Sequence, residues 1–315
     1  MLRRLLRARV LLLGCAMLAG GAWVWTNGAG GAWAPPTHPA RPGSSAPATA
    51  AGALVSLLGR TPAAPGGGAT PDCPWPSDAG TSLLAPRAGD GSGCRQFLGL
   101  LVPCTTAKTC MRGKDGKTSC WKMVDDTSLL KELLPSVFST LSAATAPPRL
   151  DLVIYVGYDG GDAIYDTDAA RAALPQRIKA ALATMTKPGD GGVANLPRIG
   201  LQLVRCAESR SMVSASNCIS QQADADGAEY TYRVNDDTVF ETAGWLDALP
   251  AALQALDPPN VGVVGPQASG GNWKVLTYDA VHRSHLEIFG GHRYPAVFKN
   301  WYSDDWISKV PCVCD

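Results

Sequence analysis

The chain has 315 residues, a formal net charge of +1, and 46% hydrophobic against 17% charged residues. The near-neutral balance removes the electrostatic argument for a nucleic-acid partner, and the hydrophobic content is sufficient for one sizeable core. Gly and Pro crowd the first third of the chain, so we expect the folded, functional part to lie in the remainder.

The N-terminus combines positive charge with an uncharged run. Four arginines precede the segment from Val10 to about Trp25, which is the order found in a secretory signal or a signal anchor. The sequence therefore predicts a cytosolic tail at 1–9 and a signal anchor or signal peptide at 10–33. An anchor implies a single-pass type II protein of the Golgi or endoplasmic reticulum membrane with a lumenal domain, whereas cleavage after the small residues at 20–22 implies a secreted protein.

The cysteines indicate an oxidising compartment. Ten are present, and the nine beyond the apolar segment are expected to form disulfides in an exported chain, with one left over. Residues 34–72 are rich in Ala, Gly, Pro, Ser and Thr, which predicts a disordered stem. Residues 73–125 hold five cysteines in a Gly- and Lys-rich setting. They predict a small disulfide-stapled segment or a cross-linked continuation of the stem, and their spacing is poor for zinc.

From residue 149 the pattern changes to alternating strands and helices. Strands are expected at 150–156, 197–205, 229–234 and 261–265, and helices at 169–185, 216–225 and 245–256. This rhythm predicts an α/β domain at 126–315, with a mostly parallel, Rossmann-like sheet and crossover helices.

An acidic segment follows the predicted strand at 229–234. Asn235, Asp236 and Asp237 come directly after Val234, at the strand end where α/β proteins bind ligands. Two adjacent carboxylates repel each other unless a cation joins them, and carboxylate oxygens suit Mn²⁺ or Mg²⁺. Capping of the next helix is the alternative, although one cap does not need two acids.

Two further groups are weaker candidates. Asp159 and Asp162 follow the strand at 150–156 among glycines, where they either contact a nucleotide or form a plain turn. His282 and His285 have the spacing of one helix face, which makes His282 a weak candidate for a metal ligand and otherwise a surface residue.

A second acidic pair lies among aromatic residues in the segment 301–306. Asp304 or Asp305 is a candidate general base, because a carboxylate can take the proton of an acceptor hydroxyl and the rings beside it can stack on sugars. Helix capping is the alternative, and it favours Asp304 as the base because the second acid is more apt to cap its own helix.

Residues 149–306 resemble the GT-A glycosyltransferases. The segment 232–238 looks like the Asp-x-Asp motif of that fold, with Asn235 in place of the first acid. Similarity to its acceptor-side segments extends over 265–266, 270–272, 289–291 and 300–306.

The resemblance implies a GT-A fold and transfer of a sugar from a nucleotide-sugar donor to a hydroxyl of a glycan or glycoprotein acceptor. It implies Mn²⁺ or Mg²⁺ held by Asp236 and Asp237, and nucleotide contacts from Asp159, Asp162, Asn235 and Asp236. Because Asn235 is a weaker ligand, the inner metal contact is expected from Asp237. The chain ends nine residues after Trp306, before any later histidine ligand of the family, which predicts a C-terminally shortened domain.

Two other functions fit the same residues. A non-catalytic, Cys-rich exported binding protein on a GT-A-like scaffold is favoured by Asn235 and the short C-terminus. A metal-dependent phosphohydrolase needs more ligands than Asp236 and Asp237 supply.

Overall fold

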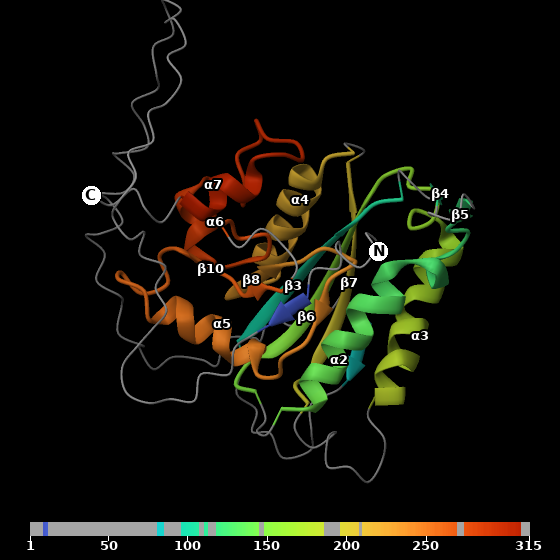
Figure 1. Cartoon of the computed structure of the whole chain (residues 1–315), viewed down its shortest axis with the longest axis horizontal. Coiled ribbons are helices and arrows are strands. Elements are labelled where there is room, and N and C mark those ends of the chain that lie inside the picture. The colour runs from blue at the N-terminus through green and yellow to red at the C-terminus, as the bar shows by residue number, and fades with distance from the viewer. Residues whose placement is uncertain are drawn as a thin grey trace, which may run out of the picture. The chain divides into compact units, whose positions relative to one another are not determined.

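A seven-stranded sheet forms the centre of the protein (Figure 1). The structure, a computed structural model, describes residues 9–11, 81–84, 96–106, 110–112, 118–144, 148–185, 196–207, 210–269 and 274–309. The strands lie in the order β10-β12-β8-β3-β6-β7-β2. Their bounds are β2 Thr81–Leu84, β3 Phe97–Cys104, β6 Asp151–Asp159, β7 Ile199–Cys206, β8 Tyr230–Arg233, β10 Val263–Val264 and β12 Asp279–His282.

The four central strands, β8, β3, β6 and β7, are parallel to one another, and β2, β12 and β10 join antiparallel at the two sides. The predicted α/β class and the parallel centre of the sheet are therefore confirmed, within a mixed sheet.

Helices cover both faces of this sheet. Along β3, Leu98, Leu100 and Val102 point into the core shared with the helices α2 (Leu134–Ser142), α3 (Asp168–Met185) and α5 (Trp245–Gln254). Their neighbours Phe97 and Leu101 pack on the opposite face, with α4 (Met212–Ala225). Because both faces are buried, β3 and the middle of β6 are continuously apolar rather than alternating.

Local signals place the helix ends. The Thr167 hydroxyl accepts a hydrogen bond from the amide of Ala170 at 3.1 Å, and that of Ser211 accepts one from Ser214 at 3.2 Å, so these residues cap α3 and α4. The cap at Ser211 starts α4 four residues before the position predicted from periodicity. Gly227, with a φ of 87°, follows the end of α4 in the left-handed conformation that glycine adopts without a steric penalty.

Shorter elements complete the described chain. A 3₁₀ turn η2 (Val124–Asp126) and a π-helix η3 (Leu129–Leu133) lead into α2, and α6 (Ser284–Ile288) and α7 (Ser303–Lys309) follow β12. Small sheets are formed by β11 (Gln267–Ala268), β1 (Arg9–Leu11) and β9 (Val239–Phe240), and by β4 (Cys110–Arg112) with β5 (Thr118–Cys120).

The boundary predicted at residue 126 is wrong. Strand β3, inside the supposed Cys-rich segment 73–125, pairs with both β6 and β8 and so lies at the centre of the sheet. The strand β2 at 81–84 also belongs to this sheet. The reason is the apolar run Phe97–Val102, which is buried along its whole length and can form a strand without support from disulfides.

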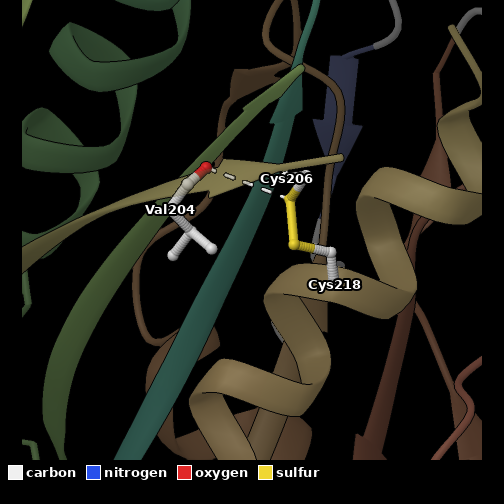
Figure 2. The surroundings of a disulfide bond; sticks show 3 residues. All are labelled: Val204, Cys206 and Cys218. Carbon is white, nitrogen blue, oxygen red and sulfur yellow. Dashed lines mark hydrogen bonds between the residues drawn. A yellow bond between two sulfur atoms is a disulfide. The ribbon is translucent and has the colours of Figure 1, made fainter. Parts of the chain in front are cut away.

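One disulfide is defined within the α/β domain. Cys206 at the end of β7 is bonded to Cys218 on α4, with a Cα–Cα distance of 6.0 Å (Figure 2). Cys120 is also disulfide-bonded, whereas the Cys104 thiol at the end of β3 is free and buried.

The predicted signal segment and stem lie outside the described residues, apart from residues 9–11. Within the described ranges, no helix is long and apolar enough to cross a membrane.

Candidate functional site

The strand order creates one special position at the carboxyl edge of the sheet. Along the chain, β6 and β7 are added on one side of β3, and β8 then pairs with the other side. Parallel sheets bind ligands at such a reversal, outside the carboxyl ends of the two strands that flank it. Here those ends are Cys104 of β3 and the segment after β8, where the amide of Val234 still donates to Leu101 at 3.0 Å. The Asn235–Asp237 segment therefore begins at the reversal.

Asp236 is turned toward β3 and the loop after β6. Its carboxylate is half-buried and interacts electrostatically with Cys104 and Tyr165. Burial, followed by the negative charges of Asp237 and Glu132, raises the pKa of Asp236 to about 7. An ionised Asp236 is thus destabilised in this position, and a bound cation would relieve that cost.

Asp237 is more exposed than Asp236, although its carboxyl group is still partly removed from water. Its charge acts on the buried hydroxyl of Tyr278, and its own pKa is raised by burial of the carboxyl. The next residue, Thr238, is buried, and its hydroxyl forms a side-chain hydrogen bond with Tyr278. Two carboxylates of different exposure are a donor set that suits a hard divalent cation or a polar ligand.

The protein does not complete a metal site by itself in the described part of the chain. There, no group of three or more His, Cys, Asp or Glu side chains is close enough to share an ion. Asp236 and Asp237 could therefore hold Mn²⁺ or Mg²⁺ only with further oxygens from water or substrate, which is usual for ions bound together with phosphates.

Asn235 is engaged inside the protein. Its side-chain oxygen accepts a hydrogen bond from Arg233 at 3.0 Å. That oxygen is therefore directed at a buried guanidinium, which leaves the amide NH₂ as the part of Asn235 with free hydrogen-bonding capacity.

Asp159 and Asp162 lie at the same edge, but their oxygens bind the protein itself. The Asp162 carboxylate accepts hydrogen bonds from the amides of Thr106 at 2.7 Å and of Ile164 and Tyr165 at 2.9 Å, and from the Thr106 hydroxyl. Asp159 accepts one from the amide of Arg210 at 3.0 Å. These bonds fix the loops after β3, β6 and β7, as the turn interpretation of the sequence requires, and they leave Asp162 little capacity for a direct nucleotide contact.

The two acids of the second pair, Asp304 and Asp305, differ in their exposure to solvent. Asp304 lies 3.7 Å from Arg233, with 34% of its side chain exposed, and burial raises its pKa although Arg233 opposes the shift. Asp305 is 51% exposed and lies 3.8 Å from Lys309 on the same helix. Asp304 is thus the acid directed at the sheet.

The two acidic segments meet around one buried ring. Tyr278, just before β12, interacts electrostatically with both Asp237 and Asp304, and burial is the main cause of its raised pKa. Tyr278 therefore joins the candidate metal-binding and candidate base regions, although they are far apart in sequence.

The prediction that His282 and His285 share a helix face is wrong. His282 is the last residue of β12 and pairs with Tyr230 at the start of β8, whereas His285 lies on α6, because the chain turns at Arg283. His282 contacts Glu229 and Ser284 at 2.9 and 3.0 Å. Three residues separate its partner Tyr230 from Arg233 at the carboxyl end of β8, which is about 10 Å at about 3.3 Å per residue, so His282 lies at the opposite end of the strand from Asp236.

Sequence reasoning missed a buried polar network beneath the site. Arg233, Asp279, Arg293 and Tyr294 are almost completely buried and contact one another. Arg233 could have been noticed as a charged residue within an apolar strand, which is rare without a partner. Asp279 and Arg293 carry no comparable signal.

No family model matches the chain, and no curated protein matches it. The functional argument therefore depends on the geometry of the site.

Proposed function

We propose that the chain is a metal-dependent glycosyltransferase, which moves a sugar from a nucleotide-sugar donor to a hydroxyl of a glycan or glycoprotein acceptor. The observation that carries the proposal is the position of Asp236 and Asp237 at the carboxyl end of β8, where the strand order reverses next to β3. Nucleotides bind at this position in parallel sheets, and paired carboxylates suit the cation that accompanies a diphosphate.

Each candidate side chain has a proposed role that agrees with its exposure. The exposed Asp237 and half-buried Asp236 hold Mn²⁺ or Mg²⁺, whose contribution when bound is to neutralise the departing diphosphate. The inner acid, Asp304, accepts the proton of the acceptor hydroxyl. Trp301 and Tyr302, with exposed fractions of 81% and 72%, offer rings beside Asp304 on which an acceptor sugar stacks.

The compartment belongs to the same proposal. The Cys206–Cys218 disulfide supports an oxidising environment, as expected for the lumen of the Golgi or endoplasmic reticulum. The N-terminal segment would then anchor the chain in that membrane, or direct its secretion if it is cleaved.

A non-catalytic binding protein on the same scaffold is the second candidate. Its support is Asn235, whose oxygen contacts Arg233 and is not offered to a metal ion. This candidate predicts nucleotide binding without turnover.

The test is calorimetry of nucleoside diphosphates and nucleotide sugars with and without Mn²⁺. We expect metal-dependent binding that Asp237→Ala abolishes while the fold is retained. Asp168→Ala is the matched control, since Asp168 is a fully exposed acid paired with Arg171. Equal affinity in Asp237→Ala and the wild type would refute the metal assignment. Mn²⁺-dependent turnover of a nucleotide sugar then separates the enzyme from the binding protein.

A further inference from the structure

Two buried arginines lie below the acidic residues of the site. Arg293 is fully buried, and its guanidinium donates to Asp279 at 2.9 Å, to the hydroxyl of Thr231 at 2.7 Å and to the Asp279 carbonyl. Its ion pair with the Asp279 carboxylate measures 2.6 Å. Asp279 therefore provides the negative charge that balances Arg293.

Arg233 lies farther than Arg293 from the Asp279 carboxylate and makes no hydrogen bond to it. Its Nε lies 3.9 Å from Asp279 and donates instead to the hydroxyl of Tyr294 at 3.2 Å. Its Nη1 donates to Asn235 and to the Thr277 carbonyl, both at 3.0 Å. All three of these acceptors are neutral, so Asp279 faces two cations and can balance only one of them.

Asp304 provides the second negative charge. Its Oδ1 lies 3.7 Å from Nη2 of Arg233, a side chain of which only 2% is exposed. A buried cation without a counter-charge is costly, so the guanidinium favours an ionised carboxylate at this position. Asp304 is held toward the sheet for the same reason, while Asp305 turns to solvent.

We infer that Arg233 is a positioning residue for the reaction, which keeps the Asp304 carboxylate charged and directed at the site through Nη2 and holds Asn235 through Nη1. The inference rests on the proposed function, because it assumes that Asp304 is the base. It couples the donor side of the site, at Asn235, to the acceptor side, at Asp304, through one planar group.

The surroundings of Asp304 support this role. The charged and titratable groups that act on it are Arg233 and Asp279 from the sheet, Asp305 from α7, and Tyr278 before β12. Arg233 is the one cation among them, and it opposes the effect of burial on the pKa of Asp304. Without Arg233, the carboxyl group would keep its proton to higher pH and would be a poorer base at neutral pH.

The first experiment measures kcat/KM against pH for the wild type, Arg233→Gln and Arg233→Lys. A base must be deprotonated, so the rate rises through its pKa. We expect the ascending limb of the Arg233→Gln variant, which lacks the positive charge, to lie at higher pH. At pH values on the limb, its kcat/KM should be about tenfold lower than that of the wild type. The ascending limb of the Arg233→Lys variant, which keeps the positive charge, should lie close to that of the wild type. Arg198→Gln is the control, since Arg198 pairs with the buried Asp151 at 3.1 Å at the opposite edge of the sheet. A lower melting temperature with an unmoved limb would overturn the inference.

The second experiment needs neither turnover nor removal of the arginine. NMR of the Arg233 Nε–H is followed against pH in the wild type and in Asp304→Asn. We expect the signal to move as Asp304 titrates and this movement to vanish in the variant. An identical pH dependence in both proteins would refute the coupling. If no nucleotide sugar is turned over, the proposed function fails, and this measurement still decides the link between Arg233 and Asp304.

Discussion

Replacing Asp236 by Asn should stabilise the metal-free protein while it removes a metal ligand. Burial and Asp237 raise the pKa of Asp236 to about 7 from 3.8. The protonated form is therefore favoured in the folded state, and stability is lost as pH rises from about 4 through 7. At about 1.4 kcal/mol per pH unit, the ionised carboxylate costs about 4 kcal/mol at pH 8, and the neutral amide avoids this cost.

The assay is thermal unfolding of the wild type and Asp236→Asn at pH 4 and pH 8, with and without Mn²⁺. The two proteins should melt together at pH 4, and the variant should melt on the order of 10 °C higher at pH 8 without metal. Mn²⁺ should raise the melting temperature of the wild type only. The two proteins must be compared at the same pH, because burial lowers the pKa of His285, which makes the stability of both proteins fall with decreasing pH over an overlapping range. Equal melting of the metal-free proteins at pH 8 would show that Asp236 is not destabilised, and the electrostatic argument for the site would fail.

Three other predictions test separate parts of the structure. Asp304→Asn should lower turnover by about 10²–10⁴-fold with nearly unchanged donor affinity, whereas a capping role predicts a normal rate and little change in stability, since Asn caps helices about as well as Asp. Turnover and melting temperature of the same variant distinguish these outcomes. Burial lowers the pKa of His285 to about 4, so about 3 kcal/mol of stability should be lost as pH falls from 6.5 to 4. In His285→Phe that dependence should disappear from denaturant titrations, and its persistence would assign it to another group. Cys218→Ala should cost about 3 kcal/mol in denaturant unfolding, since the disulfide closes a segment with a sequence separation of 12. A loss near zero would mean that the bond is absent in solution.

The strands and helices could be predicted where burial repeats along the chain. The apolar runs of β6, β7 and β8 and the spacing in α3 gave these elements to within a few residues, because both sheet faces are covered, so that β6 and β8 are buried throughout and β7 is buried over most of its length. The position of the acidic pair after β8 follows from the same reasoning. A charged segment directly after a buried strand must lie at the strand's carboxyl end.

The central strand was missed because its surroundings in sequence are misleading. Residues 97–104 lie among cysteines and glycines, and a single short apolar run does not reveal where it will pair. Only the register, with β6 on one side and β8 on the other, makes β3 the strand beside which the order reverses.

The roles of individual side chains divide in the same way. The sequence by itself determined an α/β chain with carboxylates at a strand end and a second acidic pair near aromatic residues. Only the tertiary structure decided that Asp304 points inward to Arg233, that the oxygens of Asp162 are occupied by amides, and that His282 lies at the far edge. Periodicity reports burial, which is a property of one segment. Hydrogen bonds and ion pairs depend on which distant segments the sheet order and the crossover helices bring together, and nothing in a local pattern encodes that.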